Sequence, residues 1–175
     1  MTSATDWPAR LAEMVYFVEL TEEDRQLIRA SAPIINKHAR SLTDTLYDRF
    51  LEYPKTRKFF VTETDEEDEE RIEGNKQTMI RWLRDRGFAD VGDSFARYVR
   101  AIGMMHRNLP RDRAQHGPVP SQYVIATISF YQTAIATLIS QNIPDTDLAT
   151  RTTIAWNKLL VVELDMLLGV YLNDK

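Results

Sequence analysis

The sequence predicts an all-α protein, and three of its features point to this class. Glycine is scarce, with 6 residues among 175. No stretch keeps the strict alternation of apolar and polar residues that marks a half-buried strand. Apolar residues recur instead at helical spacing, as Phe95, Val99, Ile102 and Met105 do. We therefore expect helices packed on helices.

Length and composition favour one soluble globular domain over residues 1–175. A chain of this size can bury a real core. Its content of 43% apolar and 27% charged residues is ordinary for a globular protein. We find no linker, internal repeat or composition shift that would mark a second domain.

Local signals place the helices of the first half. A short helix is expected over residues 7–18. Thr21 caps the next helix, whose first turn is acidic, as the helix dipole favours. Pro33 is expected to break or kink the chain and to start a fresh helix that runs to about Tyr53. Pro54 then opens a short helical turn that ends at Phe59 and Phe60.

The second half continues in the same way. The acidic run 65–70 is interpreted as a solvated helix start rather than a metal or partner site, and its helix stops at Arg86, before Gly87. A further helix covers about 91–107. A loop with Pro110, Gly117, Pro118 and Pro120 follows. Two long helices, about 120–141 and 145–172, close the chain.

Charge, cysteine content and the N-terminus exclude several classes of function. The net charge of −4 gives no basic footprint for nucleic acid. Without cysteine there can be no disulfide, no thiolate catalysis and no covalent c-type haem attachment. The first ten residues lack a signal-peptide pattern. We expect a cytoplasmic protein.

The segment 117–144 contains no charged residue, which raises the question of a membrane span. It carries too many polar residues for a convincing span, so we expect a buried helix and no membrane crossing. The last helix is apolar nearly all round over 159–171. This surplus of apolar surface predicts a subunit interface. We expect a homodimer through helices 120–141 and 145–172.

The motifs of common enzyme classes are missing. The sequence has no GxSxG, P-loop, GxGxxG or HExxH pattern, and its acids are scattered. Each of the three histidines can be weighed. His38 lies on the face of its helix opposite Tyr47, and His116 lies in a Pro/Gly loop. His106 ends an apolar-faced helix that includes Val99 and Ile102. A rigid helix can present a neutral imidazole to haem iron, although a lone histidine is more often a core or surface residue.

Four segments, in order, resemble the protoglobins and the globin domains of globin-coupled sensors. These segments span about residues 20–172 and read LTEEDRQLIRASAPIINKHARSLTDTLYDRFLEYPKTRKFF, RAIGMMHR, VPSQYVIA and AWNKLLVVELDMLLGVYL. The resemblance implies a globin-like fold, a modified 3-over-3 helical sandwich with an extra N-terminal helix and without the fourth globin helix. It also implies non-covalent haem b.

By position, the resemblance assigns roles to individual residues. His106 would be the proximal iron ligand. Tyr47 would be the distal tyrosine that faces bound gas, with Leu46 beside it. Phe60 would pack on the haem edge. Two residues one turn apart on the following helix, Asn75 and Met79, would line the distal side.

The chain departs from both groups at two points. Its loop between His106 and Tyr123 is longer than in most sensor domains, and its arm before Leu20 is shorter than the protoglobin arm that helps to bury haem. The expected function is reversible binding of oxygen, carbon monoxide or nitric oxide, for sensing or gas handling. The alternatives are a haem-free globin-like signalling module and a haem enzyme acting on nitric oxide or peroxide. An enzyme is less expected, because no distal acid–base pair is evident.

Overall fold

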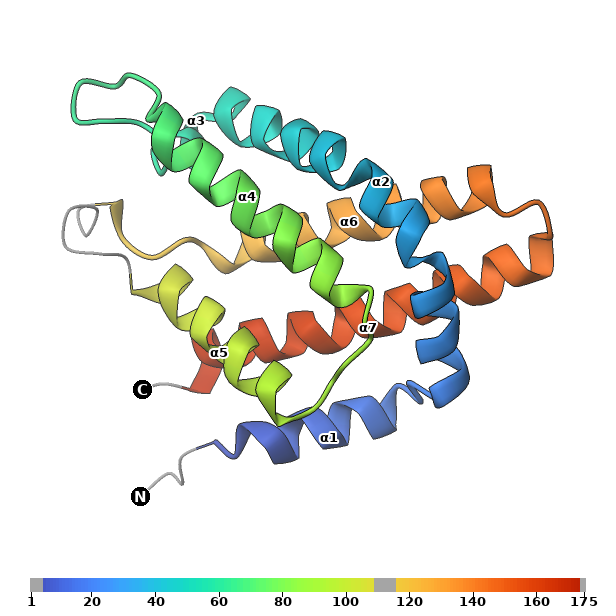
Figure 1. Cartoon of the computed structure of the whole chain (residues 1–175). Helices are drawn as coiled ribbons and strands as arrows, with labels where there is room; N and C mark the ends of the chain where they lie inside the picture. Colours follow the sequence, from blue (N-terminus) through green and yellow to red (C-terminus); the bar gives the residue numbers. More distant parts are fainter. Residues whose placement is uncertain (1–4, 109–115, 174–175) are drawn as a thin grey trace.

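A computed structural model of the chain describes residues 5–108 and 116–173, so Pro110 of the expected loop lies outside the described residues. In these residues the chain forms seven α-helices and one isolated β-bridge, between Val61 and Glu67. The helices, shown in Figure 1, are α1 (Trp7–Phe17), α2 (Glu22–Glu52), α3 (Pro54–Arg57), α4 (Glu69–Arg86), α5 (Asp93–Arg107), α6 (Ser121–Asn142) and α7 (Thr146–Asn173). The predicted all-α class is confirmed.

Side-chain caps explain where several helices begin. Thr21 and Asp24 form a capping box at α2, in which each side chain accepts a hydrogen bond from the backbone N–H of the other. Asp68 caps α4 by accepting from the N–H of Arg71, at 3.0 Å. Asp65 pairs with Arg57 in the preceding turn. The end of the acidic run, Asp68 to Glu70, thus forms the predicted helix start, whereas Asp65 stabilises the turn before it.

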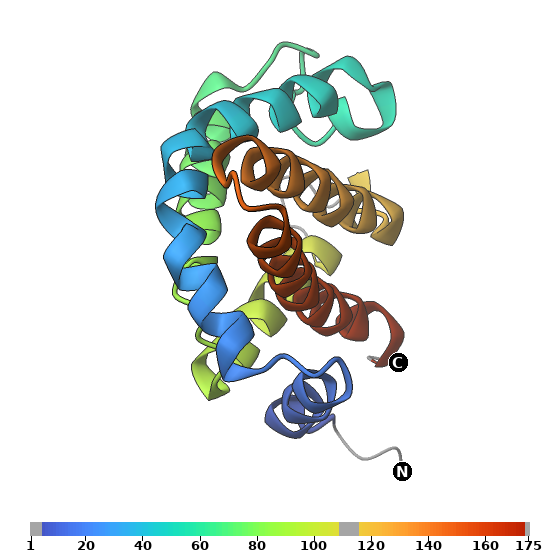
Figure 2. The same cartoon turned by 90° about the vertical axis from the view of Figure 1, so that its right-hand side faces the viewer.

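The predicted break at Pro33 is wrong, because α2 continues through this residue from Glu22 to Glu52. A proline inside a helix removes one backbone hydrogen bond and bends the helix. Figure 2 shows α2 as an arc. Pro33 is exposed, whereas Ile28 and Ile35 on either side of it are fully buried. Packing on both sides of the proline therefore holds the two halves of α2 in one helix.

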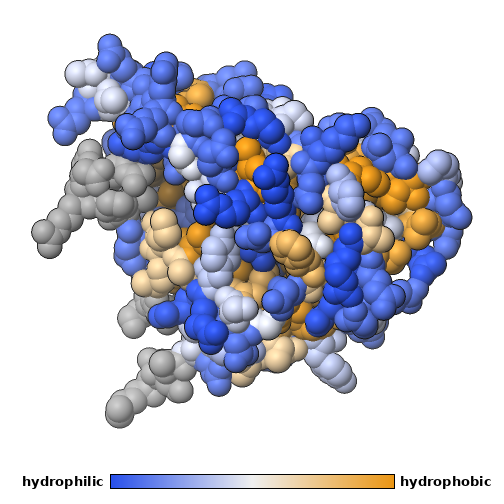
Figure 3. Space-filling view, viewed as in Figure 1, coloured by the Kyte–Doolittle hydropathy of each residue, from blue (hydrophilic) through white to orange (hydrophobic). Residues whose placement is uncertain are grey.

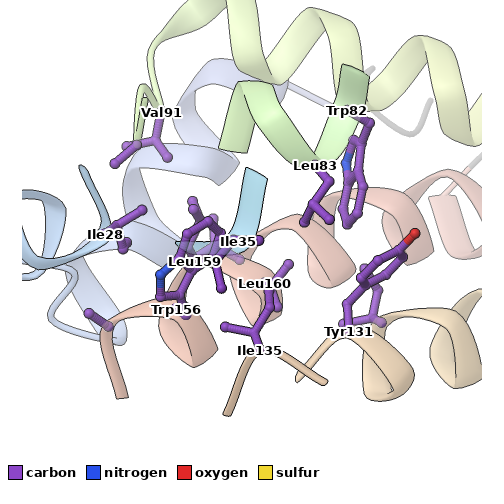
Figure 4. Packing of buried hydrophobic residues seen from close by; sticks show 14 of the residues in the cluster. Ile28, Ile35, Trp82, Leu83, Val91, Tyr131, Ile135, Trp156, Leu159 and Leu160 are labelled. Atoms are coloured by element: carbon purple, nitrogen blue, oxygen red, sulfur yellow. The ribbon is translucent and has the colours of Figure 1, made fainter. Parts of the chain in front are cut away.

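The last helix, α7, runs through the middle of the molecule. It contacts α1, α2, α5 and α6, and α2 in turn contacts α4 and α6. Figure 4 shows Trp156, Leu159 and Leu160 of α7 packed among buried side chains of α2, α4 and α6. Most of the apolar surplus in 159–171 is buried inside this one chain. That surplus alone is therefore no sign of a subunit interface.

The helix α6 is covered much less completely. It is long and apolar enough to span a membrane, and 33% of its most apolar window is buried. A groove between α6 and α7 is lined by small and polar side chains, among them Thr133, Ala136 and Asn157. Figure 3 shows a largely hydrophilic face with some hydrophobic patches.

Candidate functional site

A cavity of about 340 Å³ lies among six of the helices. Its wall is mostly apolar and aromatic, as is usual for sites that bind small molecules and cofactors. The contributing elements are α2, α3, α4, α5, α6 and α7, together with residues that follow α3 and α5. The site therefore draws on residues from Tyr47 to Leu167 and exists only in the folded chain.

The one histidine in the cavity wall is His106, in the last turn of α5. Its Nδ1 lies 2.9 Å from the carbonyl oxygen of Ile102, one turn earlier. A carbonyl can only accept, so Nδ1 carries the proton and Nε2 keeps a free lone pair. Burial lowers the pKa of His106, against the opposing effect of the bond to Ile102. The imidazole is therefore neutral near pH 7, which is the form that ligates metals.

The other two histidines lie elsewhere. His38 is half-buried on α2, and His116 packs against the Phe59 ring at a centroid distance of 6.1 Å; neither lines the cavity. Among the described residues, no three histidines or carboxylates come together as a metal cage. A single imidazole suits a metal that brings its other ligands with it, as the iron of haem does. The donor set and the apolar wall thus fit haem.

Tyr47 contributes a buried phenol to the cavity from α2. Two phenylalanines contact its ring edge to face, Phe50 at a centroid distance of 5.5 Å and Phe60 at 5.4 Å. No described residue forms a hydrogen bond with its hydroxyl, whereas the nearby Tyr131 hydroxyl lies 3.4 Å from Thr43 Oγ1. Burial raises the pKa of Tyr47, so the hydroxyl keeps its proton and can donate to a ligand.

The helix α4 supplies one continuous part of the wall. Asn75, Met79 and Trp82 follow one another at intervals of four and three residues, so they share a face of this helix. Asn75 is the polar member of the three. Its amide is a second candidate to bond a ligand.

Six of the eight residues expected at the site line the cavity: Tyr47, Phe60, Asn75, Met79, Ile102 and His106. Leu46 and Val99 do not; both are buried elsewhere in the core. Leu46 lies about 100° around α2 from Tyr47, and Val99 lies two turns, about 10 Å, from His106 along α5. Adjacency in sequence or a shared helix face did not bring either residue to the cavity.

Sequence reasoning missed two notable residues of the wall, Trp82 and Glu163. Glu163 is 2% exposed, and its Oε1 accepts a hydrogen bond from Trp82 Nε1 at 2.7 Å. Burial raises the pKa of Glu163, against the opposing charge of Arg86 and the bond from Trp82. The available signal was a lone acid in the apolar run LLVVE of the last helix, which should face either solvent or a special site.

The fold and the site together define a globin-like protein. The chain superimposes on the globin domain of the Geobacter sulfurreducens globin-coupled sensor with a TM-score of 0.77, over 91% of this chain and 96% of that one, at 22% identity. The family model for Protoglobin matches residues 8–175, so the chain belongs to the Protoglobin family. A comparison with curated proteins gives no match.

Proposed function

We propose that the protein binds haem b in this cavity, with His106 as the only protein ligand of the iron, and that it takes up oxygen, carbon monoxide or nitric oxide for gas sensing or gas handling. The observation that carries the proposal is the pairing of two groups in one apolar wall. His106 offers a neutral imidazole with its Nδ1 already engaged, and Tyr47 offers a hydroxyl without a partner among the described residues.

Each residue has a defined task in this proposal. Haem supplies an iron atom with a coordination position open to a diatomic gas. The bond to Ile102 fixes the ring orientation of His106 and makes its Nε2 a better donor. The apolar wall keeps water away, and Tyr47 donates a hydrogen bond to a ligand that carries partial negative charge.

The substitution His106→Ala tests the proposal. We expect the purified wild type to be red, with a strong haem absorption band, and the variant to lose haem or to need added imidazole. His116→Ala and His38→Ala, which change histidines outside the cavity, should keep the wild-type spectrum. A normal five-coordinate ferrous spectrum in His106→Ala would contradict the assignment. A wild type that binds no haem would favour a haem-free signalling module.

We also propose that the protein forms a homodimer through α6 and α7. The support comes mainly from α6, because the chain itself buries 33% of the residues in its most apolar window. Ile125 on this helix is 45% exposed, and the groove formed with α7 is lined by small and polar side chains against which a second helix pair can pack.

A further inference from the structure

Trp82 forms part of the cavity wall. It lies two turns beyond Asn75 on the same face of α4, and it is 8% exposed. Its indole packs on the ring of Tyr131 from α6, at a centroid distance of 4.9 Å and an interplanar angle of 54°. Figure 4 shows the two rings facing each other between α4 and α6. A ligand that extends towards this part of the wall meets the indole.

A buried carboxylate holds this indole in place. The hydrogen bond of 2.7 Å from Trp82 Nε1 to Glu163 Oε1 joins α4 to α7. The second oxygen of Glu163, Oε2, lies 3.3 Å from Nε of Arg86, which is itself buried. The guanidinium of Arg86 lies over the rings of Phe95, at 4.7 Å, and Tyr98, at 5.4 Å.

A buried glutamate such as Glu163 is energetically unfavourable in a protein core. Burying a carboxylate and a guanidinium carries a desolvation penalty, and apolar residues of similar size often serve stability at least as well. The ion pair is also imperfect, since neither Oε2 nor the Arg86 Nε has a hydrogen-bond partner of good geometry among the described residues. The one well-formed bond of the carboxylate is the bond to the indole. The buried carboxylate therefore fixes the indole of Trp82 better than it pairs with Arg86.

We propose that Glu163 is a positioning residue that fixes the indole of Trp82, and that this anchored indole limits the size of ligand the site accepts. The proposal rests on the proposed function, because it concerns the ligands of that site. Met79, the neighbouring wall residue on α4, has a flexible side chain that can yield to a larger ligand. Trp82 cannot yield without leaving a buried N–H unpaired, which is unfavourable. Diatomic gases therefore fit, and bulkier ligands are excluded.

The anchor can be tested without haem. The chain has three tryptophans, so a ¹⁵N-labelled haem-free sample gives few indole N–H signals, and Trp82→Phe identifies the one of interest. We expect slow hydrogen exchange at Trp82 in the wild type and in Glu163→Gln, whose amide oxygen still accepts. The double variant Glu163→Leu/Arg86→Met, which removes both buried charges, should exchange at least tenfold faster. Unchanged exchange in that variant would overturn the anchoring role.

A second variant keeps the test decisive if the double variant fails to fold. Glu163→Asp keeps the charge opposite Arg86 but withdraws the acceptor from the indole by one methylene. We expect faster exchange of the Trp82 indole N–H than in Glu163→Gln. Equal exchange in the Asp and Gln variants would contradict the proposal.

The size limit is tested on the haem-loaded protein with n-butyl isocyanide and methyl isocyanide. The affinity for the larger ligand, divided by that for the smaller one, should rise at least tenfold, about 1.4 kcal/mol, in Trp82→Phe and in Glu163→Leu/Arg86→Met. If the double variant does not fold, Glu163→Asp takes its place and should show the same rise. In Glu163→Gln the ratio should stay within about threefold of the wild type. A ratio that stays constant across all variants would overturn the size limit while leaving haem binding intact. A wild type that takes up no haem would overturn the proposed function and the size limit together, whereas the exchange experiment would still decide on the anchor.

Discussion

At the scale of single residues, the site depends on polar side chains set in a mostly apolar wall. An apolar wall makes each buried hydrogen-bond donor and acceptor more important, because water is not there to replace it. Tyr47 and His106 both line the cavity, and in the proposed function they would face the ligand and the iron. Burial raises the pKa of Tyr47 and lowers the pKa of His106. In both cases it favours the neutral form of the side chain.

Tyr47→Phe should speed oxygen dissociation about three- to tenfold, because it removes one hydrogen bond worth about 0.5–1.5 kcal/mol and keeps the ring. Carbon monoxide is less polar and should dissociate at nearly the wild-type rate. Stopped-flow measurement of both rates checks this prediction. If oxygen dissociates equally fast from the two proteins, Tyr47 does not bond the ligand.

His106 should also make the stability of the haem-free protein depend on pH. Its pKa is lowered in the folded state, so as pH falls through the ordinary histidine value of about 6.5 the unfolded chain takes up a proton first. The free energy of unfolding should therefore fall on acidification from pH 7 to 5.5, by up to about 1.4 kcal/mol per pH unit.

The contribution of His106 is measured as the difference between wild type and His106→Gln in urea titrations across this range. The subtraction is needed because the raised pKa of Glu163 acts in the opposite direction, with more protons bound in the folded state. Parallel pH profiles for the two proteins would show that burial does not disfavour the charged imidazole.

At the scale of helices, close crossings place the functional side chains. Gly103 lies one turn before His106, where α5 meets α7. A Cβ added at this position would lie 2.8 Å from Cγ2 of Val170 and 3.3 Å from the carbonyl oxygen of Leu167. The missing side chain at Gly103 therefore lets α5 approach α7 closely enough for His106 and Leu167 to share one cavity.

Gly103→Ala should separate the two helices and lower the free energy of unfolding of the haem-free protein by about 1–3 kcal/mol. Gly74→Ala is the matched control, because a Cβ at Gly74 of α4 meets nothing within 4 Å. Alanine there should stabilise the protein by about 0.5–1 kcal/mol. Thermal melts of the two variants give the comparison. Similar shifts in both would mean that the crossing is not tight.

At the scale of the whole molecule, the proposed dimer places a second copy against α6 and α7. A charge designed to break such a dimer must stand at a position that the chain itself does not fully bury. Val162, within the apolar run 159–171, is fully buried in the chain, so a charge there would disturb folding instead. Ala136, in the groove between α6 and α7, is the better position.

Ala136→Glu should halve the mass seen by light scattering, because it introduces a charge that a close helix contact cannot accommodate. Ala12→Glu makes the same chemical change on the exposed side of α1 and should leave the mass unchanged. A wild type that is monomeric at high concentration would contradict the dimer.

The sequence by itself determined the helical class and most helix boundaries, and its resemblance to a known family suggested most of the six expected residues that line the cavity. The class and the boundaries follow from local signals, namely apolar spacing and capping residues such as Thr21. The residues expected at the site came mainly from short segments around Tyr47 and His106 that resemble the family. Each of these signals depends on residues within a few turns of one another, so it can be recognised without knowledge of the fold.

Only the tertiary structure decided the rest. It showed that α2 passes unbroken through Pro33, that the apolar α7 is an interior helix, and that Leu46 and Val99 point away from the cavity. It also joined Trp82 to Glu163, which are 81 positions apart in the chain. These facts depend on which helix packs against which, and that choice is made by the burial of the whole core rather than by any local pattern.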